Sequence, residues 1–231
     1  MIIKSWDDLP EFMRISEVKP YYDVLKQHKL YLVLKRGFDI VASIILLVIF
    51  AIPMLIIAIG IKIDSQGPVF YRQERVTLYG KKFRIHKFRT MVDNADKKGS
   101  TVTISDDCRI TRIGKKIRST RLDELPQLFD VIVGNMTFVG TRPEAVKYVE
   151  MYGKYDGAYY ATLLLPAGIT SETSIKFKNE AELLGTGDNI DEKYMNDVLP
   201  KKMVWNLNSI QNFSFTSELL TMARTVIAVL R

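Results

Sequence analysis

An uncharged apolar run extends from Ile40 to Ile61, and it limits what this chain can fold into more than any other feature. Written as one helix, the run would be about 33 Å long, which is enough to cross the hydrocarbon core of a bilayer. It is interrupted at Ser43, Pro53 and Gly60. The run therefore predicts a membrane-embedded helix.

Two features of this run weigh against a straight membrane span. Pro53 removes a backbone hydrogen bond and kinks a helix, and each of the two arms beside it is too short to cross a bilayer. Basic residues flank the run on both sides, and such flanks favour the cytoplasmic side of a membrane. A re-entrant helix, which enters and leaves by one face, satisfies both flanks. Composition alone leaves the span and the re-entrant helix open.

The charge of the chain favours an anionic partner. Lysine and arginine number 33 against 26 aspartates and glutamates, and the pI is about 9.3. Such a chain suits a phosphorylated substrate, an anionic lipid or a nucleic acid. The basic residues are interleaved with acidic ones, which argues against nucleic acid. The single Cys108 excludes an internal disulfide, and no cysteine–histidine cluster has the spacing of a metal site.

The remaining patterns predict a helix-rich α+β fold. Residues 1–34 are expected to be a polar N-terminal extension that rests on the membrane or on the main domain. The expected elements are strands at 69–71 and 82–88, helices at 109–120, 122–132 and 144–160, a turn at 166–170, an acidic loop at 179–189 and an amphipathic C-terminal helix at 219–231.

The adjacent carboxylates Asp123 and Glu124 lie among arginines at the start of the helix expected at 122–132. Acidic residues at this position commonly cap a helix and oppose its dipole. Carboxylates also bind Mg²⁺ together with substrate phosphates, and a carboxylate beside phosphate-binding cations can act as a nucleophile. The pair is therefore either a helix cap or a reaction centre.

Arginine is well represented around the pair, and Arg142 lies in a tight turn at 140–144. The planar guanidinium suits phosphate oxygens. These features indicate phosphoryl-transfer chemistry at a membrane surface. A membrane-anchored basic adaptor that binds anionic lipid or nucleic acid without catalysis, with the carboxylates as a helix cap, is the alternative.

An ordered series of short motifs covers residues 35 to 230. These are Lys35-Arg36-Gly37-Phe38-Asp39, the apolar run with its proline, Gly67-Pro68-Val69-Phe70, Gln73-Glu74-Arg75, Lys87-Phe88-Arg89-Thr90-Met91, Gly114-Lys115-Lys116-Ile117-Arg118, Leu122-Asp123-Glu124-Leu125-Pro126-Gln127-Leu128, Gly134-Asn135-Met136, Val139-Gly140-Thr141-Arg142-Pro143-Glu144 and Gly168-Ile169-Thr170. The series resembles the bacterial sugar transferase family, the monotopic phosphoglycosyl transferases.

The resemblance implies that the chain transfers a phosphosugar from a UDP-sugar to polyprenyl (undecaprenyl) phosphate, needs Mg²⁺ and releases UMP. It implies that Asp123 is the nucleophile, which forms a covalent phosphosugar intermediate, and that Asp123 and Glu124 hold the metal. Four basic residues then lie near the substrate phosphates: Lys87, Arg89, Arg118 and Arg142.

The resemblance also implies a monotopic membrane protein with a re-entrant helix broken at Pro53. The expected parts are the extension at 1–34, the membrane helices at 35–63 and a cytosolic catalytic domain at 64–231. The protein would lie on the cytoplasmic face of a bacterial inner membrane, as a possible homodimer. It would serve the synthesis of a polysaccharide or glycoconjugate, such as lipopolysaccharide or exopolysaccharide.

The sequence departs from the family pattern at two places. Pro166-Ala167-Gly168 replaces a common Arg-Pro-Gly, and residues 171–177 lack the usual aromatic and glutamine residues. These departures bear on the recognition of nucleotide and sugar more than on the chemistry of transfer.

Overall fold

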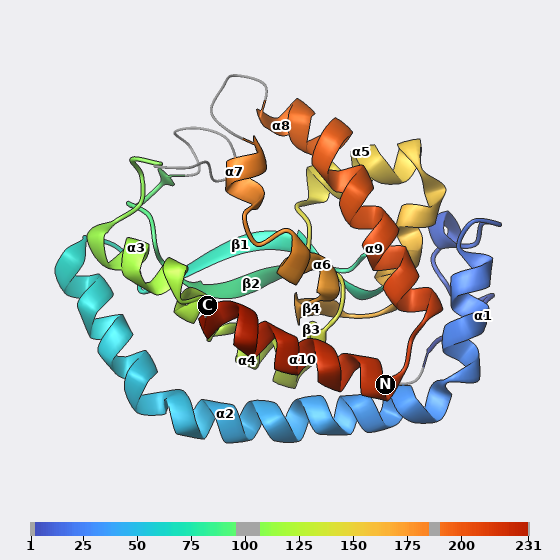
Figure 1. Ribbon diagram of the computed structural model, residues 1–231, viewed down its shortest axis with the longest axis horizontal. Helices are drawn as coiled ribbons and strands as arrows, with labels where there is room; N and C mark the ends of the chain where they lie inside the picture. The colour runs from blue at the N-terminus through green and yellow to red at the C-terminus, as the bar shows by residue number, and fades with distance from the viewer. Residues whose placement is uncertain (1–2, 96–106, 185–189, 231) are drawn as a thin grey trace.

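The computed structural model describes residues 3–95, 107–184 and 190–230 (Figure 1). Within these ranges the fold is helix-rich α+β, as predicted, and its strands form two two-stranded sheets. The elements in chain order are α1 (Lys19–Gln27), α2 (Lys29–Asp64), β1 (Phe70–Val76), β2 (Lys82–Phe88), α3 (Arg112–Ser119), α4 (Gln127–Val133), β3 (Met136–Val139), α5 (Val146–Tyr155), β4 (Ala167–Thr170), α6 (Glu172–Lys176), α7 (Glu180–Leu184), α8 (Ile190–Lys193), α9 (Leu199–Gln211) and α10 (Phe215–Leu230).

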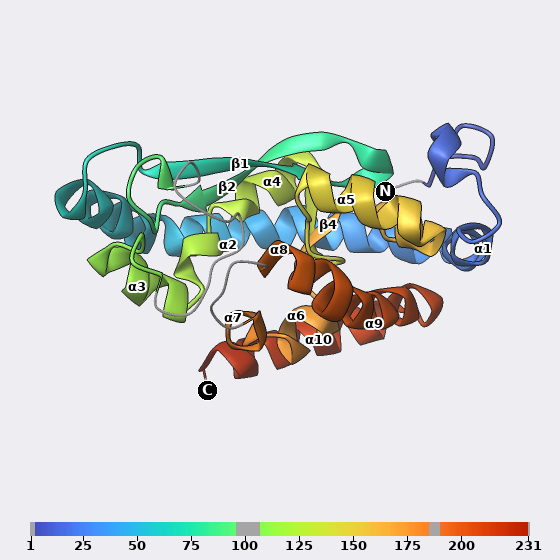
Figure 2. The same ribbon diagram turned by 90° about the horizontal axis from the view of Figure 1, so that it is seen from above.

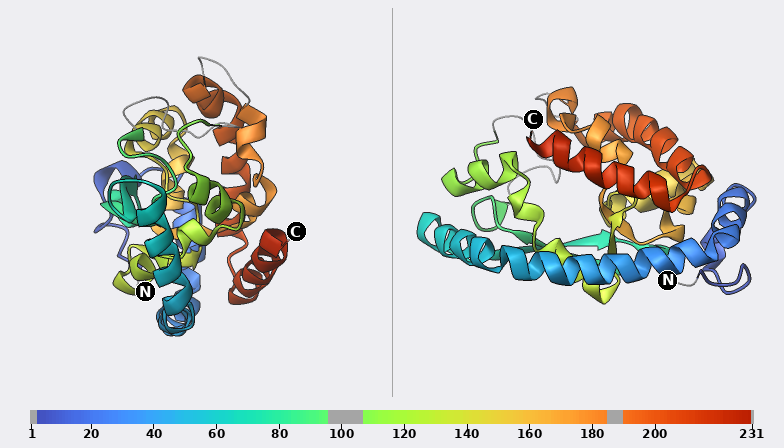
Figure 3. Two further views of the ribbon diagram at one scale, coloured as in Figure 1. Left: turned by 90° about the vertical axis from the view of Figure 1, so that its left-hand side faces the viewer. Right: turned by 60° about the horizontal axis from the view of Figure 1, so that its bottom comes forward.

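The apolar run lies in α2, which is long and apolar enough to cross a membrane. It runs along one edge of the molecule (Figure 3), and only 6% of its most apolar stretch is buried by the rest of the protein. Ile52 and Ile63, for example, are largely exposed. Exposing so much apolar surface to water is unfavourable. This face is therefore suited to an apolar environment such as lipid.

Helix α2 continues through Pro53 and is assigned as one helix from Lys29 to Asp64. The structure thus differs from the predicted helix-break-helix, because the helix is not interrupted at the proline. Its ribbon turns in the C-terminal part, toward α3 (Figure 1). A proline inside a helix removes one hydrogen bond and bends the axis, so a bend without a break is physically reasonable.

The N-terminal residues pack onto the main domain. Met13, Val18, Tyr22 and Leu25 are almost completely buried, and they belong to the largest hydrophobic cluster of the protein. This cluster also takes residues from α5 and α9. Residues 1–34 are expected from the sequence to rest either on the membrane or on the main domain. The structure has the described part of this segment on the main domain.

The strands expected at 69–71 and 82–88 are present as the antiparallel hairpin β1–β2. The turn expected at 166–170 is instead a strand, because β4 pairs in parallel with β3. The two backbone segments approach closely there. A Cβ on Gly168 would lie 2.1 Å from the Gly140 oxygen, so only glycine fits. In the region expected to be an acidic loop, α7 occupies Glu180–Leu184, and residues 185–189 lie outside the described residues.

The C-terminal helix is confirmed as α10, and apolar side chains such as Leu220 and Val226 are exposed on it. Helices α6 to α10 gather on one side of the domain and the hairpin lies on the other (Figure 2). The N-terminal end of α10 contacts α2, where the rings of Phe38 and Phe215 pack edge to face. The membrane-capable helix is thus held by the C-terminal part of the fold.

A buried polar cluster fastens α2 at this point. Lys35 Nζ lies 2.6 Å from Glu218 Oε2 of α10 and donates to the Val139 carbonyl. One turn along, Asp39 accepts a hydrogen bond of 2.6 Å from Thr137 Oγ1. Burial raises the pKa of Glu218 to about 7, against the opposing charge of Lys35. The cluster joins the helix to β3 and α10.

Candidate active site

Asp123 and Glu124 lie in a single 3₁₀ turn, Leu122–Glu124, between α3 and α4. The helix expected at 122–132 is therefore divided, with the regular helix starting at Gln127. Arg121 precedes the turn with a φ of 56°, in the left-handed region, so α3 does not continue into it. The turn presents both carboxylates, each 8% exposed, to one cleft.

The turn rests on an apolar platform that it shares with the membrane-capable helix. Ile61 of α2, Phe88 of β2 and Ile117 of α3 are buried together, and Leu122 and Leu125 pack against them. Side chains on both flanks of the carboxylate pair are therefore held by this platform. The position of the pair relative to α2 is set by close packing.

The carboxylate pair lies in the first turn, as the helix-cap interpretation predicts, but it makes no capping hydrogen bond within the described residues. Arg121 is the N-cap of the 3₁₀ turn and Pro126 is the N-cap of α4, and neither position has a side-chain capping bond. The carboxylates instead face basic side chains. What they do must follow from those partners.

Glu124 is held by two cations. Its Oε1 accepts from Lys87 Nζ at 2.8 Å and from Arg142 Nη2 at 2.9 Å. Burial alone would raise the pKa of Glu124, but the charges of Arg142 and Lys87 outweigh it and hold the pKa well below its usual range. Glu124 is therefore ionised at neutral pH, and its Oε2 accepts no hydrogen bond from the described residues.

Asp123 differs from its neighbour. Within the described residues its carboxylate has no hydrogen-bond donor. Burial raises its pKa, and the charge of Glu124 adds to this, whereas Lys87 and Arg118 oppose it. A buried carboxylate near three cations, without a hydrogen-bond partner, is available to react with or to ligate a molecule in the cleft.

Two of the arginines expected at the phosphates lie in different settings. Arg118 lines the cleft, and its one hydrogen bond within the described residues is a long contact of 3.4 Å to Thr90 Oγ1. Arg89 is buried and donates to the Ser65 and Gln66 carbonyls, at 2.7 and 2.8 Å, where α2 ends. Arg89 also lines the cleft, but its guanidinium is bound to these carbonyls and anchors the end of α2, whereas Arg118 is free to meet an anion.

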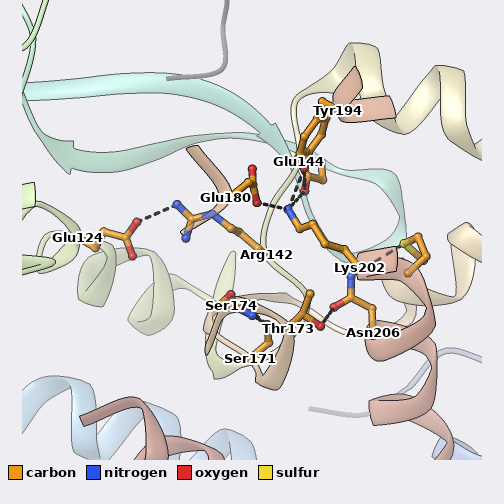
Figure 4. A network of polar contacts seen from close by, with 11 residues as sticks. Glu124, Arg142, Glu144, Ser171, Thr173, Ser174, Glu180, Tyr194, Lys202 and Asn206 are labelled. Carbon is orange, nitrogen blue, oxygen red and sulfur yellow. Dashed lines mark hydrogen bonds and ion pairs between the residues drawn. The ribbon is translucent and has the colours of Figure 1, made fainter. Parts of the chain in front are cut away.

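The cleft has a volume of about 890 Å³ and extends well beyond the carboxylate pair. Toward α2 its lining is apolar, with Leu46, Phe138 and Ala228. At the opposite end it is strongly polar (Figure 4). The structure brings the predicted site residues together, because all of them line this cleft: Asp123, Glu124, Lys87, Arg89, Arg118 and Arg142.

The polar end is a buried network that the sequence reasoning missed. Lys202 Nζ of α9 lies 3.3 Å from Glu144 Oε1, 3.0 Å from Glu180 Oε2 and 2.8 Å from the Tyr194 hydroxyl. That hydroxyl donates to Glu144 Oε1 at 2.7 Å. Only Glu144, which ends the motif at 140–144, carried a signal in the sequence. The other three come from the segment 180–202, which has no recognisable pattern.

The residues at the turn fit the predicted Mg²⁺. Among residues 3–95, 107–184 and 190–230, no group of three or more His, Cys, Asp and Glu side chains gathers as a metal site. Mg²⁺, however, is often held by one or two carboxylates and completed by substrate phosphates and water. Asp123, together with the free Oε2 of Glu124, supplies that kind of donor set.

Comparison with known proteins agrees with this site. A family model described as bacterial sugar transferase matches residues 30–231. The UDP-N-acetylgalactosamine-undecaprenyl-phosphate N-acetylgalactosaminephosphotransferase of Aeromonas hydrophila is 33% identical over 201 residues, which are 87% of this chain and 44% of that protein. The UDP-glucose:undecaprenyl-phosphate glucose-1-phosphate transferase of Klebsiella pneumoniae is 38% identical over 156 residues, 66% of this chain and 33% of that protein.

A protein with the latter name from Caulobacter vibrioides is 32% identical over 196 residues, which are 85% of this chain and 69% of that protein. The chain spans less than half the length of the Aeromonas and Klebsiella relatives. The family match itself covers most of the chain and includes the carboxylate turn, the cleft and α2. The chain belongs to the bacterial sugar transferase family.

Proposed function

We propose that this protein transfers a sugar phosphate from a UDP-sugar to polyprenyl phosphate at a membrane surface. The observation that carries the proposal is the open, buried carboxylate of Asp123 beside the tethered, ionised Glu124. The names of the relatives contain a UDP-sugar and undecaprenyl phosphate, and they support this class of substrates.

The reaction proceeds by two displacements at phosphorus. An Asp123 oxygen attacks the phosphorus that bears the sugar, the bond to the bridging oxygen breaks, and UMP leaves with the electron pair. The product is an acyl phosphate that joins Asp123 to the sugar phosphate. An oxygen of polyprenyl phosphate then attacks the same phosphorus, which releases the polyprenyl diphosphate sugar and restores the Asp123 carboxylate.

The charges of the site suit both displacements. Arg142 and Lys87, fixed by Glu124, face the transferred phosphate, and Arg118 meets the phosphate that departs with the nucleoside. Mg²⁺, held by Asp123 and Glu124, would neutralise charge on the phosphates. Two successive displacements then need only one nucleophilic carboxylate.

The acceptor is a lipid, so the site must lie at the depth of the headgroups. The apolar end of the cleft at Leu46 and Phe138 opens toward α2 and suits an isoprenoid chain. In the proposal α2 is a re-entrant membrane helix that turns at Pro53. This keeps the basic flanks and the catalytic domain on the cytoplasmic face of the inner membrane.

The topology can be tested by cysteine labelling in intact cells and in inverted vesicles. Lys26→Cys and Lys82→Cys place single cysteines at exposed sites before and after α2, in a Cys108→Ser background. We expect both cysteines to react with an impermeant maleimide in inverted vesicles and neither to react in intact cells. Labelling of one site from each side would establish a span and contradict re-entry.

The activity is tested by adding a UDP-sugar, Mg²⁺ and undecaprenyl phosphate to the purified protein and measuring UMP. We expect UMP release that depends on the metal, together with transfer of the sugar phosphate to the lipid. Salt-sensitive binding to anionic vesicles without any turnover would instead favour the adaptor function.

A further inference from the structure

The cleft has two polar centres, and the transfer reaction accounts for only one of them. The second is the network of Glu144, Glu180, Tyr194 and Lys202, which we call the Lys202 cluster. Figure 4 shows Arg142 between Glu124 and this cluster, so the two centres are neighbours along one cleft. A substrate whose phosphate is held at Asp123 therefore extends past Arg142 to the Lys202 cluster or away from it.

The Lys202 cluster is balanced in charge. Burial alone would raise the pKa of Glu144, but Lys202, the Tyr194 hydroxyl and Arg75 together lower it, so Glu144 is ionised. Burial raises the pKa of Tyr194 far above its usual range, so its hydroxyl is neutral. Lys202 and Arg75 thus offset Glu144 and Glu180, and the nearby Arg142 is paired with Glu124. A site without excess positive charge does not favour a phosphate, but it can exchange hydrogen bonds with hydroxyl groups.

The opposite flank of the carboxylate turn has the cations that a phosphate needs. Arg118 makes only a long contact to Thr90, and Arg121 makes no side-chain hydrogen bond within the described residues. Both line the cleft beside α3, which lies at the other end of the molecule from α9 (Figure 1). The nucleoside end of the donor carries the second phosphate, so it belongs on the α3 flank. The uncharged sugar is then directed toward the Lys202 cluster.

Glu180 is the member of the cluster that is placed to touch a ligand. Its Oε2 is held by Lys202, whereas Oε1 accepts no hydrogen bond from the described residues and the side chain is 29% exposed. A buried hydrogen bond of 2.7 Å between Thr173 and Asn206 fastens α6, just before α7, to α9. The carboxylate is thus held in one position at the cleft wall.

From these contacts we propose that Glu180, positioned by Lys202, accepts hydrogen bonds from hydroxyl groups of the donor sugar. This interaction determines which sugar is accepted. The proposal rests on the transfer reaction described above. It places sugar recognition in the segment after residue 170, where the sequence departs from the family pattern. A carboxylate accepts hydrogen bonds from sugar hydroxyls, and its reach depends on their orientation on the ring, so epimers are distinguished.

The test compares the wild type with Glu180→Gln on four donors: UDP-glucose, UDP-galactose, UDP-N-acetylglucosamine and UDP-N-acetylgalactosamine. UMP serves as a competitive inhibitor that lacks the sugar. For the preferred donor we expect kcat/KM to fall roughly tenfold to a hundredfold, as for the loss of a hydrogen bond to a charged group. The preference between C4 epimers should shrink, while the inhibition constant of UMP stays within about twofold.

Two further variants separate recognition from structure. Glu180→Asp keeps the charge with a shorter reach, and it should change the order of donors less than Glu180→Gln does. Glu192→Gln alters an exposed carboxylate of α8 and should leave all four donors unchanged.

The outcomes are distinct. An equal loss for all four donors would assign Glu180 a structural role and overturn the proposal. A matching loss in UMP inhibition would place the nucleoside at the Lys202 cluster and also overturn it. If the wild type releases UMP from no donor, the transfer reaction itself fails, and sugar recognition fails with it.

Discussion

The Asp123→Asn enzyme should release UMP at least about 10³-fold more slowly than the wild type, because the amide cannot form an acyl phosphate. Incubation with a labelled UDP-sugar, without the lipid acceptor, should label the wild-type chain and leave the variant unlabelled. Intact-protein mass spectrometry measures the same adduct. The variant should remain folded, since burial raises the pKa of Asp123 and its ionised form therefore opposes folding at neutral pH.

Asp197→Asn is the matched control, because Asp197 is exposed and lies outside the cleft. It should keep both the adduct and the rate. An Asp123→Asn enzyme that turns over within tenfold of the wild type would refute the assignment of the nucleophile. In that case Glu124 is the remaining carboxylate of the turn, although Lys87 and Arg142 already occupy one of its oxygens.

Replacing Lys35 by methionine should destabilise the protein by about 3–5 kcal/mol at pH 8, because it leaves the buried carboxylate of Glu218 without its partner. The cost should be smaller at pH 6. The pKa of Glu218, at about 7 in the folded protein, lies above its ordinary value, so the stability that protonated Glu218 contributes is lost as pH rises through 7. Without Lys35 this pKa rises further and the loss extends to higher pH.

Chemical unfolding in detergent, followed by tryptophan fluorescence, measures this cost. Lys35→Met/Glu218→Leu should recover most of it, since an apolar pair can replace a buried ion pair. Lys19→Met removes a half-exposed pair with Asp23 and should cost less than about 1 kcal/mol. If the Lys35 and Lys19 variants unfold alike, the buried cluster does not hold α2 in place.

Local patterns predicted the elements whose signal lies within a few residues. The hairpin strands alternate, α10 has an apolar face, and the run in α2 has the length of a membrane helix. The strand at 167–170 was missed because its partner, β3, lies about thirty residues earlier and pairing between distant segments leaves no local period. The packing of residues 1–34 was left open for a similar reason, since burial of Tyr22 depends on α9 and other distant elements.

The site was predictable in part. The motif order identified Asp123, Glu124, Lys87, Arg89, Arg118 and Arg142, and the structure places all six at one cleft. The motif order could not show that the Arg89 guanidinium is already bound to the carbonyls at the end of α2. Nor could it identify Glu180 or Lys202, because an ion pair between residues in different helices has no spacing rule.

The platform beneath the carboxylate turn has a mechanical consequence. Ile61 belongs to α2, while Leu122 and Leu125 flank the two carboxylates, and all three pack in one apolar cluster. Arg89 and the bond from the Ile113 amide to Asp64 tie the same end of α2 to the domain. In a membrane, the height of Asp123 above the lipid tails would then be a rigid property of the fold. The nucleophile could not move away from the headgroups without α2 moving with it.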